Sequence, residues 1–150
     1  EYELPIVVYN ETTFSHHITQ IAAFAAGNPQ TKIVLTHLGI PHRPNTPPQR
    51  GDEVLFQLAK HPSIFVQISG MHMYCPPPYE ILVPWIQRLA EVFGAERLLY
   101  GSNYPVMNKD TLYGEEIDLL RTGKLGIHPV EDMRRTRRSP DLRVSFQHQH

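Results

Sequence analysis

The sequence predicts an α/β fold in which four parallel strands alternate with helices. Four short apolar runs recur about every thirty residues, and a segment with helical periodicity follows each of them. Alternation of this kind requires parallel strands joined by right-handed helical crossovers. A complete eight-fold barrel needs roughly 250 residues, whereas this chain has 150. The four units therefore amount to half of a barrel, and a small open doubly wound sheet is the alternative that the pattern permits.

The composition excludes several classes of protein. Hydrophobic residues make up 41% of the chain, which allows a core, and the net charge of −1 gives no overall attraction to nucleic acid or to an anionic membrane. No apolar run approaches the roughly 20 residues of a membrane span, and nothing resembles a signal peptide. The single Cys75 excludes an internal disulfide and fits a cytoplasmic setting. Because the chain begins at Glu1 rather than at Met, we expect a partial chain.

The first two units occupy residues 5–51. A β-branched strand is predicted over residues 5–9, and Thr13 is a suitable N-cap for the helix that follows. A second strand is predicted over 32–38, and a Pro-rich loop without periodicity extends over 41–51. The apolar stripe of the first helix is formed by Ile18, Ile21, Ala22 and Ala25.

The last two units follow the same plan. Asp52 is predicted to cap a short helix, and a third strand covers 64–68. Proline is tolerated only at the start of a helix, so Pro84 is placed in the first turn of the next helix, after a looser turn, and Gly94 is its C-cap. The remaining elements are a strand over 98–100 and a helix over about 113–120.

The character of the chain changes towards its end. Five arginines face a single acidic residue in the segment 133–143, and no apolar period continues there. We therefore divide the chain into a folded region over 4–122 and a basic, disordered tail over 123–150. A solvated tail is the simpler interpretation of the arginines, and an arm for nucleic acid or an acidic partner is the alternative.

Two polar residues stand where predicted strands end. His37 lies in the segment LTHLG at the end of the second strand, and Asn103 lies in RLLYGSNYPV after the fourth. In a barrel of parallel strands, the carboxyl ends form the mouth where chemistry takes place. A histidine in that position is suited to acid–base chemistry because its pKa lies near neutrality, although a structural histidine at a strand end fits the pattern as well.

These two motifs resemble those of the amidohydrolase-related family of TIM-barrel hydrolases and decarboxylases. The resemblance covers about residues 4 to 122 and implies the C-terminal half of a TIM (β/α)8 barrel, without the H-x-H pair that the family carries on its first strand. The family usually reads G-S/T-D-W/Y-P where this chain has GSNYP, so Asn103 replaces an aspartate that holds a metal or acts as a base. Tyr9 likewise replaces a histidine that metal-dependent members place at the end of the corresponding strand.

The resemblance also implies roles for individual residues. His37 and Asn103 become the candidate catalytic residues, and Asn103 is a weak candidate metal ligand, because an amide oxygen binds a metal less well than a carboxylate does. His72 and Tyr9 are candidates for binding substrate, and Arg43 is a candidate for holding a substrate carboxylate, although a solvated loop arginine is the simpler interpretation. The implied cofactor in complete relatives is a divalent metal, with zinc as the first choice.

Two functions follow as expectations. The first is a hydrolase that acts on a cyclic ester, an amide or a small carboxylated compound, with a decarboxylase as its nearest variant; we expect this chain to be an incomplete part of it that is inactive alone. The second is a non-catalytic half-barrel that binds a partner, which the missing half and the residues Asn103 and Tyr9 favour. We expect a small-molecule substrate, no nucleic acid and no membrane as partners. Four strands leave two open sheet edges, so self-association through these edges is expected as well.

Overall fold

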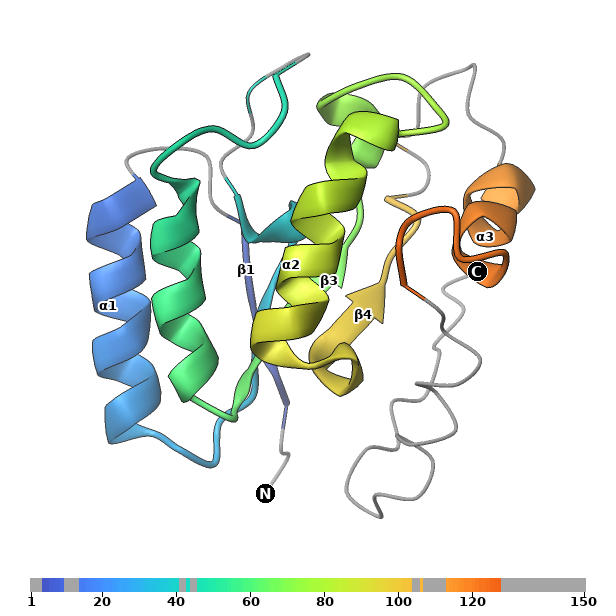
Figure 1. Cartoon of the computed structure of the whole chain (residues 1–150). Coiled ribbons are helices and arrows are strands. Elements are labelled where there is room, and N and C mark those ends of the chain that lie inside the picture. Colours follow the sequence, from blue (N-terminus) through green and yellow to red (C-terminus); the bar gives the residue numbers. More distant parts are fainter. Residues whose placement is uncertain are drawn as a thin grey trace.

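The computed structural model describes residues 4–9, 14–40, 43, 46–103, 106 and 113–127. Its centre is a parallel sheet with the order β1-β2-β3-β4 (Figure 1). A doubly wound sheet would reverse its strand order at a switch point, and this sheet follows the order of the chain. The predicted half-barrel is thus confirmed, and the open doubly wound alternative is wrong. The strands are β1 (Ile6–Val8), β2 (Ile33–Leu35), β3 (Ile64–Ile68) and β4 (Leu98–Tyr100).

Three helices lie side by side over one face of the sheet, as the right-handed crossovers require (Figure 1). They are α1 (Phe14–Gly27), the 3₁₀ helix η2 (Asp52–Lys60) and α2 (Val83–Phe93). The last helix, α3 (Tyr113–Arg121), lies beyond β4. None of the helices in the described ranges is long and apolar enough to cross a membrane.

The core lies between these helices and the sheet. Strand residues alternate between the two faces, and Ile33, Leu35, Ile64, Val66 and Ile68 are all buried within the core cluster. The opposite face is also apolar, since Val7, Val34 and Phe65 stand in register on adjacent strands. The exposed fraction on this face falls from 63% at Val7 to 7% at Phe65.

Helix α2 forms where the sequence predicts it. Pro84 occupies the first turn, where its missing N–H costs nothing. A 3₁₀ turn over Glu80–Leu82 precedes it, in place of the looser turn that was expected. Gly94 ends the helix with a φ of 85°, which favours glycine, and its N–H donates to the Ala90 carbonyl.

Two local predictions are wrong. The second strand ends at Leu35 rather than at Leu38, because His37 and Leu38 adopt left-handed backbone angles that an extended strand cannot contain. Asp52 is the first residue of its helix and not the cap, a position taken by Gly51. The Asp52 carboxylate is instead buried and pairs with Arg43.

The packed part of the chain extends past the predicted boundary at residue 122. Leu125 is fully buried in the core cluster, so the folded region runs at least to Ile127. Helix α3 is fastened by Glu116, whose buried carboxylate accepts hydrogen bonds from the Tyr79 hydroxyl at 2.7 Å and the Tyr100 hydroxyl at 3.2 Å. The predicted Thr13 cap and the basic segment 133–143 lie outside the described residues.

Candidate functional site

The candidate site lies at the carboxyl edge of the sheet, the upper edge in Figure 1. Tyr9 follows β1, His37 follows β2, Ser69 follows β3 and Asn103 follows β4. Because all four strands are parallel, their carboxyl ends meet at one edge. The expectation that His37 and Asn103 lie at the same end of the sheet is therefore met.

His37 begins a turn of unusual backbone conformation. Three consecutive residues, His37, Leu38 and Gly39, have φ angles of 52°, 62° and 68°. Each non-glycine residue in the left-handed region costs about 1–2 kcal/mol, so tertiary contacts must hold the turn. Two buried side chains supply them: the Tyr74 hydroxyl lies 3.1 Å from the His37 carbonyl oxygen, and Trp85 Nε1 donates to the Leu38 carbonyl at 3.3 Å.

Tyr74 is suited to this task by its protonation state. Its hydroxyl is shared between the carbonyl oxygens of His37 at 3.1 Å and Ile40 at 3.3 Å. Burial raises the pKa of the Tyr74 hydroxyl above its usual range, because the phenolate would lose its solvation. The Tyr74 hydroxyl therefore keeps its proton at neutral pH and serves as a hydrogen-bond donor.

The imidazole of His37 is held by two further groups. Ser69 Oγ lies 3.1 Å from Nδ1 and also accepts the backbone N–H of His37 at 3.1 Å. The Tyr9 ring contacts the imidazole edge-on, with ring centroids 5.0 Å apart and an interplanar angle of 89°. Sequence reasoning named Tyr9 and His37, and the structure brings these two together.

Gly70 allows the imidazole to approach the end of β3. A Cβ built at this residue would lie 2.5 Å from His37 Nδ1, which is too close for a real side chain, and 3.0 Å from Met73 Sδ, which is a tight contact. Its φ of 61° favours glycine for a second reason. Met73 also contacts Asn103, since Asn103 Nδ2 lies 3.7 Å from Met73 Sδ. His37 and Met73, the side chain that Asn103 contacts, therefore both lie close to Gly70.

Arg43 has a different partner from the one that was expected. Both of its terminal nitrogens bind the Asp52 carboxylate, and the backbone N–H of Gln49 donates to the same carboxylate at 2.7 Å. The Asp52 side chain is 6% exposed and that of Arg43 is 29% exposed, so the carboxylate is buried and the guanidinium is partly buried. This bidentate pair fastens the loop after β2, and it leaves no terminal nitrogen of Arg43 without a partner for a substrate carboxylate.

His72 lies in the 3₁₀ turn Met71–Met73 that follows β3, at the same edge of the sheet. The residue is half-buried, and its Nδ1 is a buried atom without a hydrogen-bond partner in the described part of the structure. A buried polar nitrogen is usually satisfied. His72 therefore remains a candidate for contact with a bound molecule.

The donor set at this edge is poor for a metal. Within the described residues, no three His, Cys, Asp or Glu side chains gather as a metal site would require. Catalytic zinc takes three protein ligands of these types. Here His37 Nδ1 contacts Ser69, and the Asn103 amide nitrogen contacts Met73. The described residues do not by themselves fit a zinc ion.

Sequence reasoning missed three residues that build the site: Gln67, Ser69 and Tyr74. Ser69 Oγ donates to Gln67 Oε1 at 3.2 Å, so the pair forms one unit with His37. A signal for this pair was present, because polar residues two positions apart at the end of an apolar strand share a face. No local pattern identifies Tyr74, which acts on His37 from 37 residues further along the chain.

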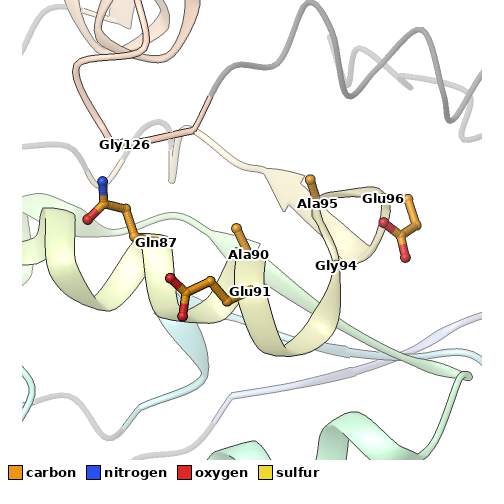
Figure 2. Close-up of a pocket in the computed structure, with 7 residues that line it drawn as sticks. All are labelled: Gln87, Ala90, Glu91, Gly94, Ala95, Glu96 and Gly126. Carbon is orange, nitrogen blue, oxygen red and sulfur yellow. The ribbon is translucent and has the colours of Figure 1, made fainter.

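A hollow of about 580 Å³ lies elsewhere on the molecule (Figure 2). It is formed by α2, by the turn before β4 and by Gly126. The side chains of Gln87, Glu91 and Glu96 surround it, and its lining includes no histidine, serine or cysteine. Because this turn leads into the amino end of β4, the hollow lies at the opposite end of that strand from Asn103.

Comparison with known proteins gives a family match over nearly the whole chain. A sequence model of the amidohydrolase family matches residues 1–148. An L-fucono-1,5-lactonase from Burkholderia ambifaria is 28% identical over 101 residues, which are 66% of this chain and 35% of the lactonase. The chain thus spans about a third of the length of this curated relative.

Solved structures share the fold. An amidohydrolase 2 from Bifidobacterium longum subsp. infantis superposes with a TM-score of 0.60 at 20% identity, covering 89% of this chain and 49% of that one. An amidohydrolase from Burkholderia multivorans with bound zinc gives a TM-score of 0.61 at 20% identity, covering 87% and 48%. The present chain therefore spans about half the length of each of these proteins.

Proposed function

Because the chain belongs to the amidohydrolase family, we propose that its carboxyl edge is one side of a hydrolytic active site for a small cyclic ester. The observation that carries this proposal is the imidazole of His37, held at the strand mouth by Ser69, Tyr9 and a strained turn. Strain that is maintained by tertiary contacts is typical of functional sites. The similarity to an L-fucono-1,5-lactonase supports a lactone as the substrate class.

His37 supplies the proton transfers of this reaction. Its imidazole accepts a proton from water as the water oxygen adds to the lactone carbonyl. When the ring C–O bond breaks, the imidazolium returns that proton to the departing ring oxygen, and the product is an open hydroxy acid. General acid–base catalysis of this kind contributes about 10²–10⁴-fold in rate.

Asn103 acts as a hydrogen-bond donor in this reaction and not as a base. Its amide carries two protons, and one is directed at Met73 Sδ. The second can donate to the substrate carbonyl and stabilise the negative charge that develops on its oxygen. His72 and Tyr9 are assigned to contact the remainder of the substrate. A divalent metal at this edge would need ligands beyond the described residues of this chain.

A non-catalytic half-barrel is the second candidate function. It is favoured by the amide at position 103 and the phenol at position 9, neither of which serves as a strong base or metal ligand at neutral pH. A decarboxylase, or a hydrolase for an amide or a small carboxylated compound, would use the same edge. Because Arg43 is paired with Asp52, a carboxylated substrate is less well matched than a neutral lactone.

A binding experiment separates the enzyme from the non-catalytic module. The chain labelled with 15N is titrated with a sugar 1,5-lactone and with its hydroxy acid, and amide shifts are followed by NMR. The hydrolase predicts shifts at His37, Ser69, His72 and Asn103, with loss of lactone binding in His37→Gln. Control variant His16→Gln changes an exposed histidine on α1 and should bind as the parent does. Shifts that are absent, or that cluster around Gln87 and Glu96, would favour the non-catalytic module.

The Asn103→Asp variant tests the origin of the site. It is co-expressed with a homologous N-terminal half-barrel that carries H-x-H, and hydrolysis is followed over a lactone panel. If position 103 once held a base, a restored carboxylate should raise the rate by about 10²–10⁴-fold and increase metal affinity. A folded complex that gains neither would show that Asn103 is not a degraded catalytic position.

A further inference from the structure

We propose that Ser69 is a positioning residue that fixes neutral His37 in the Nδ1–H tautomer, so that the lone pair of the imidazole stands on Nε2. The two ring nitrogens of a neutral imidazole are not equivalent, since one donates and the other accepts. Which nitrogen holds the proton decides which can act as the base. The catalytic meaning of this inference rests on the proposed function, whereas the tautomer itself can be measured without a substrate.

The assignment follows from counting protons at Ser69 Oγ. A serine hydroxyl has one proton to donate and two lone pairs to accept. Ser69 donates its proton to Gln67 Oε1 at 3.2 Å, and a carbonyl oxygen can only accept. The backbone N–H of His37 donates to one lone pair of Oγ at 3.1 Å. The remaining contact, 3.1 Å from Oγ to His37 Nδ1, then requires a proton on Nδ1.

The surroundings of Ser69 keep this arrangement in place. Ser69 is 2% exposed, so bulk water has little access to exchange partners with its hydroxyl. Gln67 and Ser69 stand two residues apart at the end of β3 and therefore share a face. The Gln67 side chain places Nε2 beside Gly101, where a Cβ would lie only 2.4 Å away, and Oε1 towards the Ser69 hydroxyl.

This arrangement prepares His37 for the reaction proposed above. With the proton held on Nδ1, Nε2 is the only ring nitrogen that can accept a proton from water. When Nε2 takes that proton, the Nδ1–H···Oγ hydrogen bond persists and orients the imidazolium. Fixing a histidine tautomer through the second ring nitrogen is a general means of controlling its basicity.

The test reads the tautomer directly. The two tautomers give different patterns in two-bond 1H–15N correlation spectra of the ring, recorded near pH 8, above the ordinary histidine pKa of about 6.5. The His37 signal is assigned by its loss in His37→Gln. We expect the Nδ1–H pattern in the parent chain and a change to the Nε2–H pattern in Ser69→Ala. Ser63→Ala is the matched control, since Ser63 is buried just before the same strand and far from His37.

Two variants at Gln67 make the test independent of Ser69→Ala. Gln67→Leu removes the acceptor, so the Ser69 proton can turn to Nδ1, and the Nε2–H pattern should appear. Gln67→Glu keeps an acceptor and should keep the Nδ1–H pattern. An Nε2–H pattern in the parent chain, or an unchanged pattern in both Ser69→Ala and Gln67→Leu with native circular dichroism, would overturn the proposal. Absence of lactone binding together with the expected tautomers would overturn only the proposed function.

Discussion

Gly70 shows how closely single residues are fitted at the carboxyl edge of the sheet. Its backbone has a φ of 61°, and both His37 Nδ1 and Met73 Sδ occupy the space where a side chain would begin. The histidine ring and the left-handed conformation therefore select glycine for separate reasons. Any larger residue must displace the imidazole from Ser69.

Gly70→Ala is predicted to lower the free energy of unfolding by about 1–3 kcal/mol, from backbone strain and overpacking. Urea denaturation measures this change, and the His37 ring shifts report whether the imidazole has moved. Gly27→Ala is the control, because Gly27 ends α1 with nothing within 4 Å of an added Cβ. It should be neutral or stabilise by roughly 0.5–1 kcal/mol. Equal effects of both variants would contradict the close fit at Gly70.

For single residues, the sequence predicts where the site side chains lie better than it predicts which groups they contact. His37 and Asn103 could be found because both follow short apolar strands in recognisable motifs. The contacts that define them could not, because Ser69, Tyr74 and Met73 reach them only after the strands are paired. Arg43 illustrates the same point, since its partner Asp52 was assigned to capping a helix.

Among the secondary-structure elements, the connection before β4 depends on one side chain. Arg97 donates to the carbonyl oxygens of Phe93 at 2.5 Å, and of Ala59 and His61 at 3.0 Å each. It thereby joins the carboxyl ends of α2 and η2, where backbone carbonyls lack helical partners. Burial lowers the pKa of Arg97 from its usual value, and the guanidinium remains charged at neutral pH.

Arg97→Lys is predicted to destabilise the fold by about 1–3 kcal/mol. The guanidinium donates from Nε to one carbonyl and from Nη1 to two others, and the single ammonium of lysine cannot reach all three. Thermal and urea unfolding measure the loss. Arg88→Lys is the control, because both arginines lie over an aromatic ring, Arg97 over Phe93 and Arg88 over Phe56. Arg88 pairs with Glu91, yet its side chain is 56% exposed. It should change stability by less than about 0.5 kcal/mol. If Arg97→Lys were as stable as Arg88→Lys, Arg97 would not stabilise the connection before β4 as assigned.

Element boundaries could be predicted where local chemistry decides them. Helix α2 begins and ends as Pro84 and Gly94 require. The end of β2 could not be predicted, because the left-handed turn at His37 is stabilised by Tyr74 and Trp85 from distant parts of the chain. Hydrophobic alternation gives no signal for such a turn.

For the whole molecule, the unequal covering of the sheet is the main feature. Helices bury one face, while Val7 is 63% exposed on the other, and among the described strands β1 pairs only with β2. Leu4 and Ile6 add exposed apolar surface along the same edge, at 75% and 41%. An apolar edge strand is a template for pairing with another chain.

The purified chain is therefore predicted to self-associate with increasing concentration, as measured by sedimentation velocity. Val7→Lys should shift the distribution towards monomer, because a charge on an edge strand disfavours pairing. Phe24→Lys is the control, since it places the same charge on an apolar residue of α1 that is 42% exposed and away from the edge. A monodisperse monomer at every concentration would contradict the prediction.

The turn at His37 has a consequence for how this site can be inherited. The groups that hold the turn and the imidazole, namely Gln67, Ser69, Gly70, Tyr74 and Trp85, all lie within the stretch from residue 37 to residue 85. Of the described contacts, only the Tyr9 ring comes from outside it. A recombination event that moved this single stretch of gene into another barrel would carry the histidine with it, together with the serine that contacts its ring and the two side chains that hold its turn.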